Sequence, residues 1–399
     1  MMKKKQRLVL CFFCDDYVII NTGDKMLYLD YCATTFPSKK VLKAFNKASK
    51  KYVGNPNSSH FLGVKANNRI KKSTSNIAKL LKAEPEDIIY TSGASEANNL
   101  AIKGVCRANK GKHIITTKLE HSSVTASINR LLDDGYDVSF LKLNTDGTID
   151  IDNLKEILTD DTVLVSIVGV DSEMGIKQDI NLIGKELKKY PNCYFHVDAT
   201  QMVGKTNLDF KNVDLISFSA HKFFGIKGIG CLVKQGKFKM IPLIDGGRST
   251  TKYRSGTPAL ELIVSLEKAL TLAYKDFDKK LRYVNKISND LKEFLSCHDN
   301  IKINSTSKSI PQVINFSVDN SRKLVDMLTE RGICLSTKSA CSSVDSLSKS
   351  VMSLYDDEKR ANNSVRISLS YVTTRSQIRK FKKIFNECYD KIGENDENN

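Results

Sequence analysis

The chain has 399 residues, of which 41% are hydrophobic and 27% are charged, so it can bury a large core and has room for two or three domains. No run approaches the roughly 18 consecutive apolar residues of a membrane span, which excludes a transmembrane protein. The formal net charge of +17 admits a nucleic-acid or acidic protein partner. The lysines are nevertheless spread along the whole chain without an aromatic-interleaved basic motif, so we expect no direct nucleic-acid binding.

The first 25 residues differ from the rest of the chain and are predicted to be an extension. Their apolar run, residues 8–13, is too short for a secretory signal, and two aspartates follow it. Met26 is an alternative natural start, because organised sequence begins after it. Ten cysteines in a long chain without such a signal fit a reducing compartment, and we expect a cytoplasmic protein. Cys11 and Cys14 have CxxC spacing but no second pair nearby, so we expect no metal site.

From about Asp87 to Lys234, short β-branched runs alternate with longer segments whose apolar residues recur at helical spacing. The predicted strands are residues 87–91, 113–117, 137–143, 162–170, 193–199, 215–220 and 228–234. The predicted helices between them are residues 95–108, 122–135 and 180–190. This alternation is typical of an α/β fold, a mostly parallel sheet covered by helices. Because such sheets bind ligands at the carboxyl ends of their strands, functional residues are expected just after the strands.

The remaining sequence predicts a second, smaller domain of α+β type. Its predicted elements are helices within residues 258–295, strands near residues 312–318 and 364–370, and a closing helix over residues 375–392. We therefore assign residues 41–275 to a large domain, and residues 26–40 together with 276–395 to the small domain.

The clearest local motif is Ser217-Phe218-Ser219-Ala220-His221-Lys222, which closes a predicted strand and precedes a glycine-rich turn. Most lysines are solvated surface charges, but this one would lie at a strand end beside two hydroxyls and an imidazole. A lysine whose surroundings lower its pKa can form a Schiff base. Lys222 is therefore a candidate for binding an aldehyde cofactor such as pyridoxal phosphate (PLP).

A carboxylate closes the preceding strand in the segment His196-Val197-Asp198-Ala199-Thr200-Gln201. Burying a carboxylate is costly unless it is paired. A protonated pyridine nitrogen would be a suitable partner, because an aspartate there keeps the ring an effective electron sink. The alternative is that Asp198 caps the next helix.

The segment Thr91-Ser92-Gly93-Ala94-Ser95-Glu96 follows the strand at residues 87–91 and opens a predicted helix. Its backbone N–H groups and the Ser95 hydroxyl would point at one place. Helix N-termini bind phosphate for electrostatic reasons, although a simple capping turn would look the same.

Together with Glu120-His121-Ser122-Ser123, these three segments resemble the cysteine desulfurases of the NifS/IscS type, class V aminotransferases among the fold-type I PLP enzymes. The resemblance covers about Met26 to Gly393, nearly the whole chain. The matching segments, in the family's order, are YLDYCATTFPS, GNPNSSH, TSGASEANNLAIKG, GKHIITTKLEHSSV, VDATQMVGK, SFSAHKFFGIKGIG, YRSGT, KSACSS and SVRISLS. The resemblance implies a fold-type I PLP-dependent transferase that converts L-cysteine to L-alanine.

The resemblance also implies which residues bind the cofactor, pyridoxal 5'-phosphate. Lys222 would hold it as a Schiff base and then move the Cα proton of the substrate. Asp198 would hold the pyridine nitrogen, Gln201 would hold the ring oxygen, and His121 would stack on the ring and assist proton transfers. The residues that would grip the phosphate are Ala94, Ser95, Ser219 and His221.

Two further residues follow from the same resemblance. Thr257 would reach the phosphate from a second subunit, which implies a homodimer. Arg366 would bind the substrate carboxylate by a bidentate charge-assisted pair.

The presence of Cys341 indicates which of the reactions of this superfamily the chain catalyses. It lies in a serine-rich polar stretch, Ser336 to Ser343, which favours a reachable nucleophile over a packing thiol. By the resemblance, its thiolate would attack the substrate sulfur and carry it as a persulfide. The stretch up to about Leu354 lacks apolar patterning and is predicted to be an arm that delivers the sulfur to an acceptor.

The sequence departs from the family at two places. The family usually has two asparagines before Glu-x-Gly, whereas this chain has Asp171 and Ser172. The second asparagine touches cofactor and substrate, so Ser172 would donate a shorter or water-mediated hydrogen bond there. Residues 245–253 also lack the Gly-Gly-Gly stretch of the housekeeping members. These departures indicate a divergent branch, whose acceptor would be an iron–sulfur scaffold or a tRNA-thiolation enzyme.

Two alternatives to a cysteine desulfurase remain. One is a selenocysteine lyase or another PLP-dependent lyase or aminotransferase. The other is a basic tRNA-associated protein without catalysis, which would show no cofactor spectrum and bind RNA in a salt-sensitive way. The presence of Lys222, Asp198 and His121 together favours an enzyme.

Overall fold

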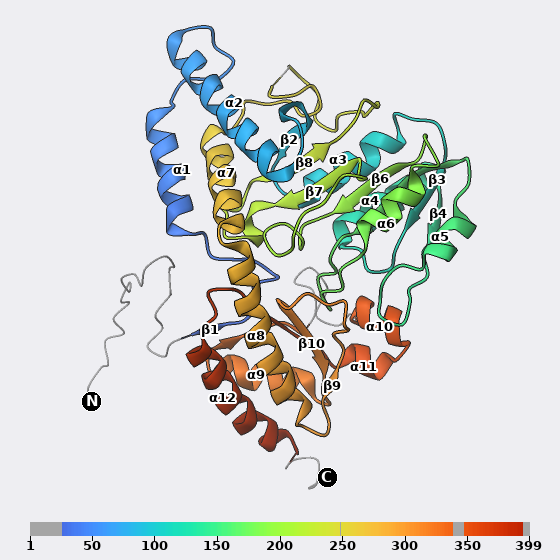
Figure 1. The fold of residues 1–399 in the computed structure, drawn as a ribbon, viewed down its shortest axis with the longest axis vertical. Helices are drawn as coiled ribbons and strands as arrows, with labels where there is room; N and C mark the ends of the chain where they lie inside the picture. Colours follow the sequence, from blue (N-terminus) through green and yellow to red (C-terminus); the bar gives the residue numbers. More distant parts are fainter. Residues whose placement is uncertain (1–25, 248, 338–346, 394–399) are drawn as a thin grey trace, which may run out of the picture.

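The computed structural model describes residues 26–247, 249–337 and 347–393, and its larger part is built on a seven-stranded sheet (Figure 1). The strands are β2 (Ile88–Thr91), β3 (His113–Thr116), β4 (Asp137–Phe140), β5 (Thr162–Val168), β6 (Tyr194–Asp198), β7 (Leu215–Ser219) and β8 (Gly230–Lys234). Their order is β2-β8-β7-β6-β5-β3-β4. All are parallel to their neighbours except β8, which runs antiparallel to β2 and β7. The predicted α/β fold with a mostly parallel sheet is confirmed.

Helices cover both faces of this sheet. They are α1 (Lys39–Lys51), α2 (Phe61–Leu81), α3 (Ala94–Cys106), α4 (Ser122–Asp133), α5 (Ile151–Ile157), α6 (Ile180–Leu187) and α7 (Leu260–Tyr274). Helices α3 and α4 pack on one face through buried residues such as Leu100 and Ile128. The other five share a core with the opposite face, which includes Ile216 and Phe218 of β7. Because strand side chains alternate between faces, Leu215 of β7 packs on the α3 side instead.

The smaller part of the molecule lies below the large sheet in Figure 1 and has its own hydrophobic core. Its strands are β1 (Leu27–Tyr28), β9 (Lys302–Ile303), β10 (Val313–Ser317), β11 (Ile333–Cys334) and β12 (Ser364–Ser368). Its helices are α8 (Phe277–Ser296), α9 (Ser321–Glu330), α10 (Lys349–Tyr355), α11 (Glu358–Asn362) and α12 (Arg375–Gly393). Strand β10 lies between β9 and β12, antiparallel to both, and β1 pairs with β11 in parallel.

The core of the small part consists of one face of its three-stranded sheet and the apolar sides of the long helices. Phe316 of β10 and Ile367 of β12 contact this core, as do Leu291 of α8 and both Phe381 and Phe385 of α12. The long helix region predicted from Pro258 therefore divides into α7, which packs on the large sheet, and α8, which packs on the small one. The domain boundaries at residues 41, 275 and 395 stay a prediction.

The sequence-based interpretation of the stretch up to about Leu354 as an arm without apolar patterning is wrong at its end. Helix α10 begins at Lys349, Ser348 caps it by accepting a hydrogen bond from the Val351 N–H, and Val351 is fully buried. Its apolar residues form a small core with Met174 and Ile176. The apolar pattern of this helix is short, and the residues on which it packs are about 175 positions earlier in the chain. The local sequence therefore did not reveal the helix.

Three of the sequence-based predictions lie wholly or partly outside the described residues. They concern the extension over residues 1–25, the altered loop at residue 248, and Cys341. Within the part of the chain that the structure describes, no helix is long and apolar enough to cross a membrane.

Candidate active site

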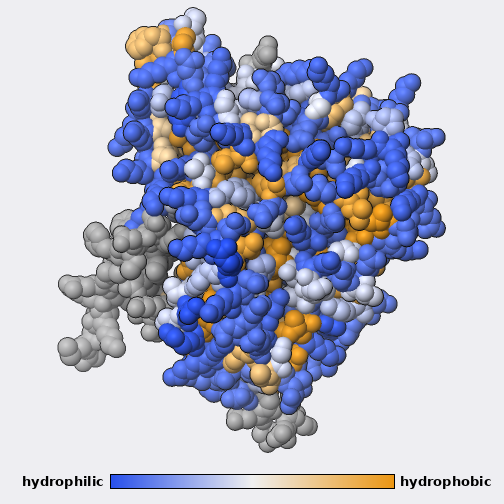
Figure 2. Space-filling view, in the orientation of Figure 1, coloured by the Kyte–Doolittle hydropathy of each residue, from blue (hydrophilic) through white to orange (hydrophobic). Residues whose placement is uncertain are grey.

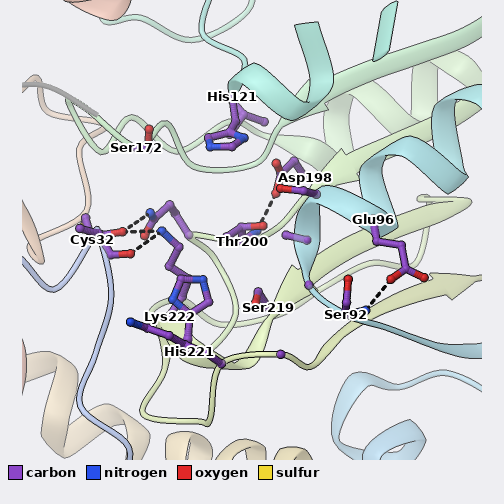
Figure 3. Close-up of a pocket in the computed structure, with 18 of the residues that line it drawn as sticks. Cys32, Ser92, Glu96, His121, Ser172, Asp198, Thr200, Ser219, His221 and Lys222 are labelled. Carbon is purple, nitrogen blue, oxygen red and sulfur yellow. Dashed lines mark hydrogen bonds between the residues drawn. The ribbon is translucent and has the colours of Figure 1, made fainter. Parts of the chain in front are cut away.

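A cavity of about 430 Å³ opens at the carboxyl ends of β6 and β7 (Figure 3). Its walls come from the ends of these strands, the turn before α3, the start of α4 and the segment around Cys32. The predicted residues that line it are Ala94, Ser95, His121, Ser172, Asp198, Gln201, Ser219, His221, Lys222 and Arg366. Segments far apart in the sequence thus bring their polar residues to one place, as expected for a parallel sheet.

Lys222 lies in a short 3-10 turn directly after β7 and reaches across the cavity to the N-terminal segment. Its Nζ donates hydrogen bonds to the carbonyl oxygens of Cys32 at 2.8 Å and Ala33 at 2.9 Å. These two carbonyls orient the amine beside the cavity. No sequence-based argument assigned a role to Cys32 or Ala33, although both belong to the YLDYCATTFPS match.

Asp198 ends β6 and is almost completely buried. Its carboxylate accepts hydrogen bonds from Asn98 Nδ2 at 2.8 Å and from the Thr200 N–H at 3.0 Å. Both of these donors are neutral, so the buried carboxylate is suited to a cationic ligand. Asn98 itself is held by Ser123 Oγ. The alternative that Asp198 serves only as a cap does not explain its place in the cavity wall.

His121 is the N-cap of α4, and this role determines which ring nitrogen carries the proton. Its Nδ1 accepts a hydrogen bond from the Ser123 N–H at 3.1 Å and lies 2.8 Å from Ser123 Oγ. Burial lowers the pKa of His121, an effect that Lys222 and Lys349 strengthen and Asp198 opposes. At neutral pH we therefore assign a neutral ring with its proton on Nε2.

The end of the cavity next to the N-terminus of α3 is suited to an anion. The N-terminus of α3 points there, and its N-cap, Gly93, offers no side-chain hydrogen bond to the first turn. Ser219 and His221 line the same end. His221 Nδ1 lies 3.0 Å from Thr34 Oγ1, and burial, together with nearby lysines, lowers its pKa to about 4. The ring is therefore neutral at pH 7 and binds as a hydrogen-bonding group.

Glu96 lies in the first turn of α3 and lines this end of the cavity. Its negative charge is compensated by its hydrogen-bond donors, so it does not prevent an anion from binding there. Its Oε1 accepts from Arg254 Nε at 3.0 Å, and its Oε2 accepts from the Ser92 N–H at 2.7 Å. The carboxylate thus connects the turn before α3 with the segment that carries Thr257.

Arg366 projects from β12 into the cavity wall and is about 1% exposed. Its Nη2 pairs with Asp30 Oδ1 at 2.8 Å, and its Nη1 donates to the Ser172 carbonyl at 2.8 Å. Its buried Nε has no hydrogen-bond partner among the described residues. Leaving a buried charged donor unsatisfied costs free energy, so this N–H is the donor that we expect a substrate carboxylate to take.

Replacement of Arg366 by lysine is expected to raise the KM for an amino-acid substrate about 10- to 100-fold with a smaller change in kcat, because lysine keeps the charge but loses the planar fork. Steady-state kinetics with L-cysteine would measure this. Arg360→Lys is the matched control: Arg360 is held by Asn304 and stacks on Tyr355, away from the cavity. An unchanged KM in Arg366→Lys would contradict the assignment.

One predicted residue of the described chain is not brought to the cavity by the chain itself. Thr257 is exposed and does not line it, so a contribution from Thr257 requires a second chain. Cys341 lies outside the described residues. Both described segments that flank the undescribed stretch are hydrogen-bonded near the cavity: the backbone of Ser336 exchanges two hydrogen bonds with the wall residue Arg366, and Ser348 Oγ donates to Glu173, which follows the wall residue Ser172.

The cavity has the parts that PLP requires. A buried carboxylate can pair with the pyridine nitrogen, a helix N-terminus with Ser219 and His221 can bind the phosphate, and Lys222 lines the same cavity. The Nε of Arg366, which has no hydrogen-bond partner within the described part of the chain, adds a donor for a carboxylate. No group of three metal-binding side chains is found among the described residues. The fold and the site together define a fold-type I PLP-dependent enzyme.

Comparison with known proteins identifies the family. Residues 27–381 match the family "Aminotransferase class-V". The chain is 37% identical to "Cysteine desulfurase IscS" of Dictyoglomus turgidum, with 88% of this chain and 91% of the relative covered. It is 36% identical to "Cysteine desulfurase, mitosomal" of Encephalitozoon cuniculi, with 90% and 85% covered. The chain belongs to the NifS/IscS cysteine desulfurase family, whose members depend on PLP.

Solved structures agree with this assignment. A "NIFS-LIKE PROTEIN" superposes with a TM-score of 0.86 at 29% identity, covering 92% of this chain and 99% of that one. A structure titled "SspA in complex with cysteine" has a TM-score of 0.77 at 30% identity, covering 87% and 99%. The predicted fold-type I architecture is therefore confirmed.

Proposed function

We propose that the chain takes sulfur from L-cysteine, releases L-alanine and carries the sulfur as a persulfide on Cys341. The observation that carries the proposal is that Lys222, Asp198 and Arg366 line one cavity in a member of this family. PLP, when bound there, supplies an electron sink that stabilises negative charge at the substrate Cα. The residues proposed to hold it are Asp198 at the ring nitrogen, Gln201 at the ring oxygen, and Ala94, Ser95, Ser219 and His221 at the phosphate.

The chain's own residues have distinct tasks in this proposal. Arg366 binds and orients the substrate carboxylate. Lys222 Nζ, oriented by the carbonyls of Cys32 and Ala33, moves the Cα proton. His121 presents Nε2 to the cavity and can exchange a proton there, because its Nδ1 is committed to Ser123. The Cys341 thiolate forms a bond to the substrate sulfur as the carbon–sulfur bond breaks.

Product analysis tests the function directly. The purified chain with PLP should release alanine and, with a thiol reductant, sulfide in equal amounts from L-cysteine. A strong preference for selenocysteine, or turnover of an amino-acid and keto-acid pair without sulfide, would instead indicate a selenocysteine lyase or an aminotransferase.

The active form is proposed to be a homodimer in which Thr257 reaches the phosphate site of the partner chain. Figure 2 shows apolar atoms at the tip of the α1–α2 arm, where Val53 and Phe61 are 73% and 75% exposed. Ile241 and Leu243, in the segment that leads to Thr257, are also exposed. Exposed apolar groups of this kind mark interfaces. Light scattering should give the mass of two chains, and Phe61→Asp should shift it toward one.

The sulfur acceptor is proposed to be an iron–sulfur scaffold or a tRNA-thiolation enzyme. Pull-down with the Cys341-persulfide form would identify which protein takes the sulfur. The cytoplasmic location stays a prediction; the names of some relatives place those proteins in mitosomes or mitochondria, and cell fractionation would decide it for this chain.

A further inference from the structure

Lys205 is a buried lysine that lies behind the cavity wall. It follows β6 by seven residues, is 7% exposed, and does not itself line the cavity. Its Nζ donates to Gln201 Oε1 and lies 3.7 Å from Cys32 Sγ. Its own carbonyl accepts a hydrogen bond from Gln312 Nε2 at 3.0 Å, which ties its backbone to the small part of the molecule.

Gln201 is the cavity residue that Lys205 contacts, and the contact determines which way its amide faces. The oxygen and nitrogen ends of a glutamine amide have nearly the same shape, so packing alone does not distinguish them. A lysine ammonium has three donors and no acceptor, so only the amide oxygen can face it favourably. The NH2 group then faces the other way, and one of its N–H bonds goes to the Cys32 carbonyl at 3.0 Å.

The orientation of this amide matters for the proposed binding of PLP. The ring oxygen of PLP is anionic in its working form and accepts hydrogen bonds, so it needs the NH2 end of Gln201. A reversed amide would place oxygen against oxygen and repel it. After the bond to Cys32, a second N–H of Gln201 remains for the cavity that this side chain lines.

A purely structural role explains Lys205 poorly. Burying an ammonium is costly, and burial lowers the pKa of Lys205, although Cys32 and Asp30 partly oppose this effect. An apolar residue of the same length would fill the space without that cost. The groups that face the ammonium are Gln201, Cys32, Asp30 and the like-charged Arg366, and the direct hydrogen-bond acceptors among them are Gln201 and Cys32.

We propose that Lys205 is a positioning residue: it holds Gln201 with its NH2 group toward the ring oxygen of the cofactor. The proposal rests on the predicted role of Gln201. Without Lys205 only the bond to the Cys32 carbonyl favours this orientation, so the amide turns over more often and the ring oxygen loses a donor for part of the time. The lysine therefore acts on the cofactor through Gln201 and not by direct contact.

The test is a pH titration of the visible absorption band of the lysine-bound cofactor. A hydrogen-bond donor to the ring oxygen withdraws electron density from it and makes the imine proton easier to lose. Removal of that donor therefore raises the pH midpoint of the imine titration. Gln201→Leu, which removes the donor, is expected to raise the midpoint by about 1 pH unit. Lys205→Met, equal in length but uncharged, is expected to raise it in the same direction, and Lys205→Arg, which keeps an N–H donor, to restore it.

The double variant separates an effect through Gln201 from a general disturbance. Lys205→Met should cause no further shift when Gln201 is already leucine. Lys234→Met is the matched control, because Lys234 is equally buried but lies in β8, where its Nζ donates to the Gly236 carbonyl. The pH midpoint of the Lys234→Met variant should equal that of the unaltered chain. Should Lys205→Met fold poorly, Lys205→Gln, whose amide can face either way, should show a smaller shift in the same direction.

The outcomes distinguish three failures. An unaltered chain that shows no cofactor band would overturn the PLP site itself. A normal band that Gln201→Leu does not move would overturn the role of Gln201. Lys205 is not a positioning residue for Gln201 if Gln201→Leu moves the midpoint while both Lys205→Met and Lys205→Gln leave it unchanged. The same conclusion follows if Lys205→Met shifts the midpoint equally when Gln201 is already leucine.

Discussion

Replacement of Lys222 by alanine should abolish the visible absorption band of the bound cofactor and lower kcat/KM for cysteine by about 10⁴-fold or more. The substitution removes both the amine that binds PLP covalently and the group that moves the Cα proton, and loss of a positioned acid–base group alone costs about 10²- to 10⁴-fold. The cofactor should still bind non-covalently, because the carboxylate of Asp198 and the N-terminus of α3 remain.

The measurement combines spectroscopy with chemical trapping. Borohydride reduction of the unaltered holoenzyme should attach the cofactor to the peptide that contains Lys222, as read by mass spectrometry. Lys237→Ala is the control, because Lys237 is exposed on the surface and does not line the cavity. Trapping on another lysine, or a full visible band in Lys222→Ala, would refute the assignment.

Replacement of Cys341 by serine should separate cofactor chemistry from sulfur transfer. None of the residues proposed to hold the cofactor is changed, so the visible band should be unchanged. Sulfide release should fall by roughly 10²-fold or more, because serine cannot accept the sulfur as a persulfide. Alkylation followed by mass spectrometry should find the added sulfur on Cys341 of the unaltered protein after brief exposure to cysteine.

The described surroundings of Cys341 support this expectation. Ser336 is bonded to the backbone of Arg366 on one side, and on the other Ser350 Oγ donates to Asp171 Oδ1 at 2.7 Å. The described residues before and after the undescribed stretch are therefore bonded to Arg366, which lines the cavity, and to Asp171, the neighbour of the lining residue Ser172. Cys297→Ser is the control, because Cys297 is exposed at the end of α8. Full desulfurase activity in Cys341→Ser would show that another group takes the sulfur.

The strands and the motifs at their ends could be predicted from the sequence, because both depend on residues that are close together in the chain. A run such as residues 162–168 is β-branched and fully buried, and this pattern predicts a central parallel strand without knowledge of its neighbours. Once the strands are placed, Asp198 and Lys222 fall at the carboxyl edge of the sheet by topology alone. The short helix α10 was missed, because seven residues, fewer than two helical turns, are too few to show a helical periodicity.

The sequence by itself determined the fold class, the family and the residues that face the cofactor site, since these depend on local pattern and on ordered motifs. Only the tertiary structure decided how those residues are held. Cys32 orients Lys222 across 190 residues, Asp30 pairs with Arg366 across 336, and Asn98 holds Asp198 across 100. Such contacts arise from where chain segments cross in space, and local propensity carries no information about that. Lys205 is the clearest case: its sequence position marks an ordinary lysine, and its burial behind Gln201 makes it a candidate for controlling the cofactor.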